Sequence, residues 1–358
     1  MNIFLITTYI DRSESEMFCR MKQQGHNVVA IVSPETANID RLKAAGIDVS
    51  IHKIGRLDNK AVRLIKRINA ENDFDIVHIL RKHGISNYFR AVPKSKAKVV
   101  AYRGIIGNLP FYNPFAWMTF LNPKLDRVIC VCEAIRQYFL KENFVFKKFP
   151  AERYITIHKG HDIAWYDNKD KKSDAFDNVR TKHVIGCVAR MVPRKGVPYL
   201  IEAFNMIADN IDVSLMLVGN IQDKKIFESI ESSPYKDRII QTGHRTDAPV
   251  ISGKLDITVL PTLKREGLPR SIIEAMSQSV PAVVTTSGGS PEIVEDGVSG
   301  FVVPTHDSKA LANALTSLLT DDEKRLEFSE NARKRIESSF SIEKTLETTL
   351  DLYSQLLN

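Results

Sequence analysis

The second half of the chain contains a stretch that decides its fold, "KREGLPRSIIEAMSQSVPAVVTTSGGSPEIVEDGVSG", from Lys264 to Gly300. It begins in a turn, continues as a helical pattern, changes to the β-rich run "PAVVTT" and ends in a glycine turn before another helix start. Such alternation is typical of βαβ units around a parallel sheet, whose strand ends and helix starts meet at one edge. The stretch therefore predicts an α/β fold, and its turns are either packing devices or an anion-binding edge.

The same alternation extends over most of the chain and predicts two domains. Short apolar runs such as "NIFLITT", "NVVAIVS" and "KVVAYRG" alternate with helical patterns. A charge-rich stretch, 167–182, interrupts this order, which restarts at "HVIGCVAR". With 358 residues, the chain exceeds the size at which one core usually keeps growing. We expect two doubly wound, Rossmann-like domains, 1–163 and 164–338, with a cleft between them, and a C-terminal helix, 339–358, that packs back on the first.

Composition restricts the class of protein only loosely. The formal charge of +7 suits nucleic acid, an anionic membrane face or a phosphorylated substrate. The N-terminus has no basic n-region and no cleavage site, and no window approaches the ~20 apolar residues of a membrane span. We expect a cytoplasmic protein, either soluble or peripheral to a membrane. Four cysteines lack CxxC spacing and are expected to be reduced core thiols: Cys19, Cys130, Cys132 and Cys187.

Three predicted strand ends of the second domain carry residues suited to a nucleotide. The run "CVARMVPRKG" places Arg190 just beyond a strand and Lys195 near the next helix, where the two cations could grip a diphosphate. The alternative is a solvated basic loop. The third end, "TTSGGSPEIVEDG", is another glycine turn that leads into a helix. Three such ends in one domain favour a ligand-binding edge.

The second strand end carries two carboxylates around a Gly-Leu-Pro turn. The backbone amides of Gly267 and Leu268 are expected to face the crevice. Glu274 could accept hydrogen bonds from a ribose diol, and Glu266 could do the same for a sugar hydroxyl. The alternative is an i,i+4 ion pair between Arg270 and Glu274 on an exposed helix face.

From Val184 to Phe340, through "VARMVPRKG", the quoted stretch and "ARKRIESSFS", the chain resembles the GT4 family, or glycosyl transferases group 1. Glu266 and Glu274 fill the family's Glu-x7-Glu motif. The resemblance implies the GT-B fold, two Rossmann-like domains facing a cleft. It also implies a retaining enzyme that moves a hexose from a nucleoside diphosphate sugar to an acceptor hydroxyl. The resemblance favours UDP over GDP and implies no metal.

The resemblance also assigns roles to residues. Arg190 and Lys195 would bind the donor diphosphate, Glu266 the donor sugar and Glu274 the ribose. In the first domain Arg103-Gly104 stands where relatives have His-Gly, and "TTYIDRSES" lacks the usual glycine-rich loop, which leaves the acceptor side open. The candidate catalytic residues are Glu266, Arg190, Lys195 and Arg103, and the candidate donor-binding residues are Arg190, Lys195, Glu266, Gly267, Leu268, Pro269, Glu274 and Gly104.

Other functions have weaker support. His158 and His161 could form part of a metal site, but no third ligand suggests itself. An NAD dehydrogenase is disfavoured because neither first βα turn has GxGxxG. Nucleic-acid binding rests on charge alone. A non-catalytic sugar-nucleotide-binding module with a degenerate acceptor site remains the main alternative.

The acceptor side contains one further feature, the aromatic run "NLPFYNPFAWMTFLNPK", 108–124. It is either an ordinary core helix or an exposed surface that docks on an anionic membrane. The second reading predicts a lipid-linked saccharide acceptor at the inner face of the cytoplasmic membrane. The apolar residues of this run are Phe111, Tyr112, Phe115, Trp117, Met118 and Phe120, and the basic residues assigned to it are Arg90, Lys94, Lys96 and Lys98.

Overall fold

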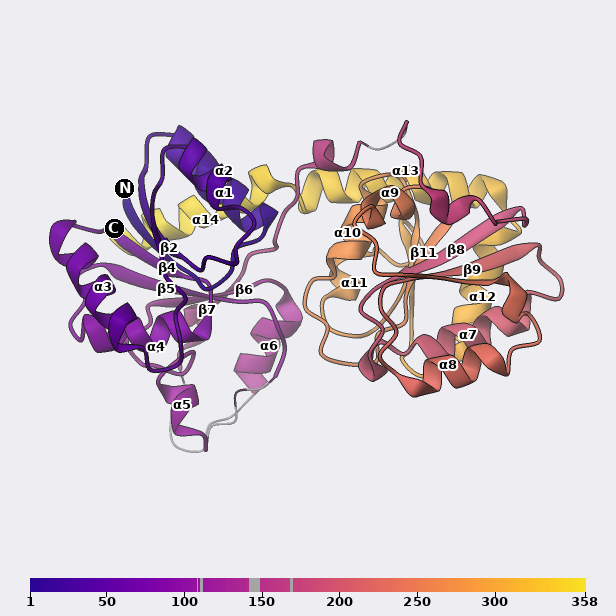
Figure 1. Ribbon diagram of the computed structural model, residues 1–358, viewed down its shortest axis with the longest axis horizontal. Helices are drawn as coiled ribbons and strands as arrows, with labels where there is room; N and C mark the ends of the chain where they lie inside the picture. The colour runs from indigo at the N-terminus through magenta and orange to yellow at the C-terminus, as the bar shows by residue number, and fades with distance from the viewer. Residues whose placement is uncertain (108, 110–111, 142–148, 168–169) are drawn as a thin grey trace. The chain divides into compact units, whose positions relative to one another are not determined.

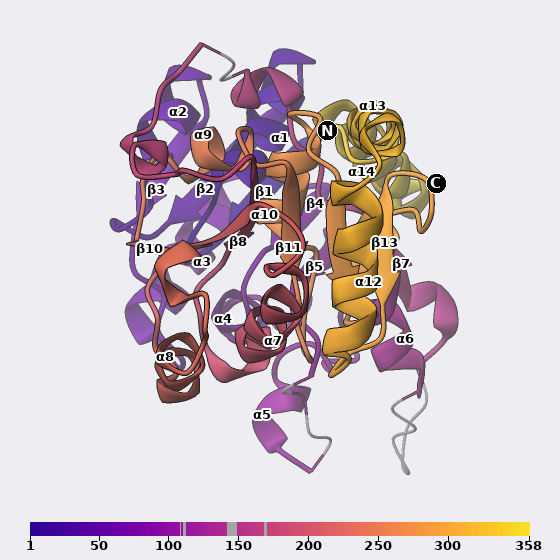
Figure 2. The same ribbon diagram turned by 90° about the vertical axis from the view of Figure 1, so that its right-hand side faces the viewer.

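The computed structural model describes residues 1–107, 109, 112–141, 149–167 and 170–358 (Figure 1). The chain forms two compact units: Met1–Gly160 together with Ile342–Asn358, and His161–Ser341. Each unit is built on one parallel sheet with helices on both faces (Figures 1 and 2). The predicted α/β class with two doubly wound sheets is therefore confirmed.

The first unit has a seven-stranded sheet of order β3-β2-β1-β4-β5-β6-β7, so the strand order reverses direction between β1 and β4. Helices α1, α2 and α14 cover one face of this sheet, and α3 and α4 cover the other (Figure 1). The elements are β1 (Asn2–Ile6), α1 (Arg12–Gln23), β2 (Asn27–Val32), α2 (Ile39–Ala44), β3 (Asp48–Ile51), α3 (Asn59–Glu71), β4 (Ile76–Ile79), α4 (Lys82–Ala91), β5 (Lys98–Arg103), α5 (Pro114–Trp117), β6 (Arg127–Cys130), α6 (Glu133–Lys141), β7 (Tyr154–Thr156) and α14 (Ile342–Leu357).

The second unit has a six-stranded sheet of order β10-β9-β8-β11-β12-β13, which places β8, β11 and β12 side by side. Helices α7, α8 and α12 pack on one face, and α9, α10, α11 and α13 lie on the other (Figure 1). The elements are β8 (His183–Val188), α7 (Val197–Ile207), β9 (Val213–Val218), α8 (Lys224–Glu231), β10 (Ile239–Gly243), α9 (Ala248–Ser252), β11 (Ile257–Leu260), α10 (Arg270–Met276), β12 (Ala282–Thr285), α11 (Ser290–Ile293), β13 (Gly300–Val303), α12 (Ser308–Leu319) and α13 (Asp322–Ser339).

Local sequence explains why the strands and helices form where they do. The central strands are buried on both faces, as near-continuous apolar runs in parallel sheets require. Helix α1 begins with a capping box, in which the Asp11 side chain accepts from the amide of Glu14 and the Glu14 carboxylate accepts from the amide of Asp11. These local signals set the helix start at the carboxyl end of β1.

The C-terminal helix α14 packs against α1 in the first unit, as predicted. The hydroxyl of Thr345 donates to the carbonyl of His158 at 2.8 Å and accepts from the amide of Gly160 at 2.7 Å. Tyr353 is fully buried, and its hydroxyl is hydrogen-bonded to Nδ1 of His78. The last helix therefore completes the core of the unit formed by the start of the chain.

The aromatic run is divided between core and surface. Phe120 is 2% exposed and Tyr112 is 77% exposed. The helix in this run, α5, has only four residues, and Phe111 lies outside the described residues. Phe115 contacts His83 and Arg56 at the carboxyl ends of β4 and β3. Lys94, Lys96 and Lys98 lie at the amino end of β5, away from Phe115, but the run itself returns to that end, where Nζ of Lys124 donates to the carbonyl of Pro93 at 2.9 Å.

The four cysteines are all buried and unbonded to one another, as expected for core thiols. Burial raises the pKa of Cys187 to about 12, so this thiol stays protonated at neutral pH. Within the described ranges, no helix is long and apolar enough to span a bilayer.

Replacing Tyr353 tests the attachment of α14. Burial lowers the pKa of His78 to about 3, and its Nε2 has no hydrogen-bond partner in the part of the chain that the structure describes. Tyr353→Phe removes the partner of Nδ1 as well, so we expect the free energy of unfolding in urea to fall by about 1–3 kcal/mol. Ser354→Ala, an exposed change on the same helix, should alter it by less than about 0.5 kcal/mol. Equal stabilities of the two variants would contradict this account.

Candidate functional site

Three of the predicted strand ends meet at one edge of the second sheet. Strands β8, β11 and β12 are neighbours and parallel, so their carboxyl ends lie at the same edge. Arg190 follows β8, Glu266 follows β11, and the glycine turn around Gly288 follows β12. The structure therefore brings together the donor-site candidates of the second unit.

A buried ion pair lies at the centre of this edge. Nζ of Lys195 is 2.5 Å from Oε2 of Glu266, and each residue is only 8% exposed. The same oxygen accepts a hydrogen bond of 2.9 Å from the hydroxyl of Thr262, which is fully buried. Desolvation of two charges is costly unless hydrogen bonds satisfy them, and this arrangement supplies such bonds.

The loop before α7 lies directly against the loop after β11. Gly196 has a φ of +67°, and a Cβ at this position would lie 2.2 Å from the carbonyl oxygen of Pro261. The amide of Leu263 donates to the carbonyl of Arg194 at 2.8 Å. Because only a glycine permits this approach, Gly196 is the reason that Lys195 reaches the carboxylate.

The third strand end packs on the first carboxylate. Gly288 has a φ of +62°, and a Cβ there would lie 2.0 Å from the carbonyl oxygen of Glu266. The amide of Gly289 donates to the carbonyl of Gly267 at 3.0 Å. The glycines of "TTSGGSPE" therefore support the backbone that carries Glu266, and they do so by close backbone contact.

Glu274 lies on α10, behind the Gly-Leu-Pro turn. Its carboxylate is 3.0 Å from Nε of Arg270, so the i,i+4 pair that was the alternative reading does form. The helix face is not exposed at Glu274, however, since its side chain is only 6% exposed whereas that of Arg270 is 65% exposed. Burial raises the pKa of Glu274, and Arg270 opposes that rise only in part. A buried carboxylate with a raised pKa is a common feature of functional sites.

The remaining candidates of this unit lie in the same two loops as the pair, between β8 and α7 and between β11 and α10. Arg190 is exposed, and its side chain makes no hydrogen bond or ion pair with any residue that the structure describes. Pro269 is the N-cap residue of α10 and provides no side-chain cap. Gly267, Leu268 and Pro269 thus lie immediately before the first helical residue, where backbone amides lack helical partners.

Arg103 and Gly104 belong to the first unit, at the carboxyl end of β5. Arg103 is 6% exposed, and its guanidinium donates to the carbonyls of Ile105 and Gly107 and lies over the ring of Phe120. Burial lowers the pKa of Arg103 to about 10. The contacts of Arg103 therefore support the loop that follows β5.

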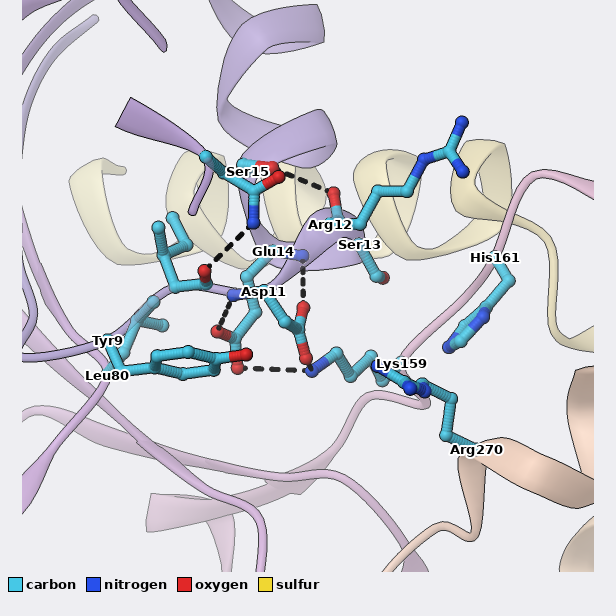
Figure 3. A network of polar contacts seen from close by, with 12 residues as sticks. Tyr9, Asp11, Arg12, Ser13, Glu14, Ser15, Leu80, Lys159, His161 and Arg270 are labelled. Atoms are coloured by element: carbon cyan, nitrogen blue, oxygen red, sulfur yellow. Dashed lines mark hydrogen bonds and ion pairs between the residues drawn. The ribbon is translucent and has the colours of Figure 1, made fainter. Parts of the chain in front are cut away.

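The carboxyl end of β1 in the first unit carries a separate polar network (Figure 3). Nζ of Lys159 pairs with Asp11 and lies 3.2 Å from Glu14, and Arg81 pairs with Glu14 at 3.2 Å. Burial alone would lower the pKa of Lys159, but Tyr102, Glu14 and Asp11 together raise it. Asp11 and Glu14 lie at the end of the loop that lacks the glycine-rich turn and in the first turn of α1, and the two cations reach them from the segments after β4 and β7.

His158 and His161 fall in different units. His161 is buried and hydrogen-bonded to the hydroxyl of Tyr166. Among the described residues there is no group of three or more His, Cys, Asp or Glu side chains that could hold a metal ion.

Sequence reasoning missed Thr262 and the hydroxyls of Ser287 and Ser290. All three side chains are buried, and the hydroxyls of Ser287 and Ser290 have no hydrogen-bond partner among the described residues. The available signal was their position, since Thr262 lies two residues after β11, and Ser287 and Ser290 flank the glycine pair after β12.

Glu274→Gln tests the cost of the buried carboxylate. Because folding raises the pKa of Glu274, its contribution to stability is present below its ordinary pKa of 4.5 and is lost as pH rises through the folded value. The unfolding free energy of the wild type should therefore decrease between about pH 4 and pH 7. In Glu274→Gln, which cannot ionise, this decrease should be smaller. Urea denaturation across this range measures it, with the exposed Glu295→Gln as control. Identical pH profiles for wild type and Glu274→Gln would argue against the burial effect.

Comparison with known proteins identifies the family. Residues 168–335 match the model of glycosyl transferases group 1. A capsular polysaccharide biosynthesis glycosyltransferase, CapM, of Staphylococcus aureus is 29% identical over 53% of this chain and 51% of its own. The UDP-Gal:alpha-D-GlcNAc-diphosphoundecaprenol alpha-1,3-galactosyltransferase of Escherichia coli is 27% identical over 68% of this chain and 64% of its own. The matches thus span about half to two thirds of these relatives.

Solved structures match along the whole chain. A glycosyltransferase from Rickettsia africae has a TM-score of 0.85 at 20% identity, covering 100% of this chain and 99% of its own. HepE of Anabaena in complex with UDP-glucose has a TM-score of 0.78 at 21% identity, and the match covers 99% of this chain and 100% of HepE. These similarities establish the fold. Residues 168–335 therefore form a glycosyl transferases group 1 domain, the domain of the GT4 family, and the chain has the GT-B fold of its structural neighbours.

Proposed function

We propose that the chain is a retaining glycosyltransferase that moves a hexose from a UDP sugar to an acceptor hydroxyl in bacterial polysaccharide, lipopolysaccharide or glycolipid assembly. The observation that carries the proposal is the buried Lys195–Glu266 pair at the edge where β8, β11 and β12 end. Family membership supports it, as does a structural neighbour described in complex with UDP-glucose. The Escherichia coli relative is named for transfer from UDP-Gal to a diphosphoundecaprenol-linked sugar, and we take that donor and acceptor as the example for this chain.

The proposed chemistry follows from the charges at this edge. The bond between the anomeric carbon and the diphosphate breaks, and the leaving group gains negative charge. Arg190 and Lys195 would take that charge, with the backbone amides before α10 as further donors. Glu266 would accept hydrogen bonds from the sugar and Glu274 from the ribose. Attack of the acceptor hydroxyl on the face from which the diphosphate leaves would preserve the anomeric configuration.

Removing either cation tests the diphosphate site. Arg190→Ala and Lys195→Ala each delete a charge-assisted interaction worth about 1.5–3 kcal/mol. We therefore expect kcat/KM for the UDP sugar to fall roughly ten- to a hundredfold or more in each variant, with the fold retained by circular dichroism. The control is Lys309→Ala, which removes an exposed lysine on α12. Wild-type transfer rates in both site variants would reject the assignment.

We also propose that the acceptor is a lipid-linked saccharide met at an anionic membrane surface. In the first unit Tyr112 is 77% and Leu57 is 56% exposed. The guanidinium of the exposed Arg56 lies 4.0 Å from the ring centroid of Phe115. Exposed aromatic and aliphatic groups beside a cation are the combination that favours a membrane interface.

Vesicle sedimentation tests the membrane proposal. Wild type should bind phosphatidylglycerol-containing vesicles at low salt and release them at high salt, because salt screens the charges. Tyr112→Ala with Arg56→Glu should abolish binding. The control, Lys94→Glu with Lys96→Glu, places the same kind of charge change at the opposite edge of the sheet and should retain more binding. Failure of the wild type to bind at low salt would favour a soluble acceptor.

A further inference from the structure

The two carboxylate oxygens of Glu266 are not equivalent. Oε2 receives both available donors, Nζ of Lys195 at 2.5 Å and the hydroxyl of Thr262 at 2.9 Å. Oε1 accepts no hydrogen bond from any residue that the structure describes, and it is not among the buried atoms without a partner. One oxygen is therefore fixed by the protein, and the other is left for a ligand.

Thr262 is itself fixed on both sides. It lies two residues after β11, it is fully buried, and its carbonyl accepts a hydrogen bond from the hydroxyl of Thr285 at the end of β12. The backbone of Glu266 is in turn held by the close approach of Gly288. The hydrogen bond from Thr262 to Glu266 thus lies within one loop whose backbone contacts the end of β12 at Thr262 and the turn after β12 at Glu266, and it orients the carboxylate.

Lys195 and Thr262, the two hydrogen-bond donors to Glu266, differ in how strongly a phosphate group attracts them. Lys195 is a cation that a diphosphate would attract, and its movement toward phosphate would weaken its pairing with Glu266. A buried carboxylate that loses its only partner is strongly destabilised. The hydroxyl of Thr262 is neutral and has no comparable attraction to phosphate, so it can keep Oε2 in place when Lys195 turns to the donor.

We propose that Thr262 is a positioning residue: its hydroxyl holds Oε2 of Glu266, so that Oε1 faces the donor sugar while Lys195 is free to engage the diphosphate. The inference rests on the proposed function. It predicts that Thr262 matters for the sugar of the donor and not for the nucleotide, because the hydroxyl acts only through Glu266.

Thr262→Val removes the hydroxyl with little change in shape. Isothermal titration with UDP should give an affinity within about twofold of wild type, whereas the affinity for UDP-glucose should fall roughly tenfold or more, since a hydrogen bond to a charged group is lost. Thr262→Ser should restore it. The control is Thr258→Val, the same change at another buried position of β11. The proposal would be overturned if Thr262→Val weakened the binding of UDP and of UDP-glucose equally, or if it weakened the binding of neither.

A measurement without ligand separates this inference from the proposed function. In urea unfolding, the effects of Thr262→Val and Glu266→Ala should be non-additive in a double-mutant cycle, because both remove the same hydrogen bond. Additive effects would overturn the positioning role. A different result would overturn the proposed function: the wild type binds neither UDP nor UDP-glucose, although the two substitutions are non-additive in the cycle. The hydrogen bond between Thr262 and Glu266 would then still be established.

Discussion

A buried ion pair between Lys195 and Glu266 is the interaction on which the candidate site depends. Two desolvated charges at 2.5 Å persist only when the surrounding backbone places them accurately. That placement comes from two left-handed glycines, Gly196 and Gly288, each of which allows one loop to contact the carbonyl of the next without an intervening Cβ. The loops that carry the site are therefore held together by backbone contact between three strand ends.

The two units use the same edge of a parallel sheet in different ways. In the second unit Arg190 is exposed and unpaired among the described residues, and Oε1 of Glu266 accepts no hydrogen bond from them. In the first unit the loop after β1 carries Asp11 and Glu14, but Lys159 and Arg81 neutralise them. Asp11 and Glu14 also form the capping box of α1. That network secures a helix start to the end of β7, which explains how the loop stays ordered without glycine.

The sequence was sufficient for the fold class, because strands and helices alternate and their apolar runs match sheets buried on both faces. It also placed Lys195 and Glu266 at one edge of the sheet, since parallel neighbours end at the same edge, and their role in donor binding stays a prediction. Other features depend on tertiary contacts and left no periodic signal. Burial of Glu274 depends on how α10 packs, and the role of Thr262 depends on which oxygen its hydroxyl meets. The aromatic run leads from the carboxyl end of β5 to the amino end of β6, and linear proximity to Lys94 does not reveal which of its residues lie at which end.

The energetic cost of the site is itself evidence for its use. Replacing a buried ion pair with apolar residues of similar volume is often neutral or stabilising, and a buried carboxylate with a raised pKa opposes folding at neutral pH. Glu266 and Glu274 are 8% and 5% exposed and lie within one short loop and helix. Packing alone would be served as well or better by apolar side chains there. The two carboxylates therefore lower the stability of the fold, as functional sites often do. In return they can accept hydrogen bonds from the hydroxyl groups of a ligand, and a nucleotide sugar carries such hydroxyls.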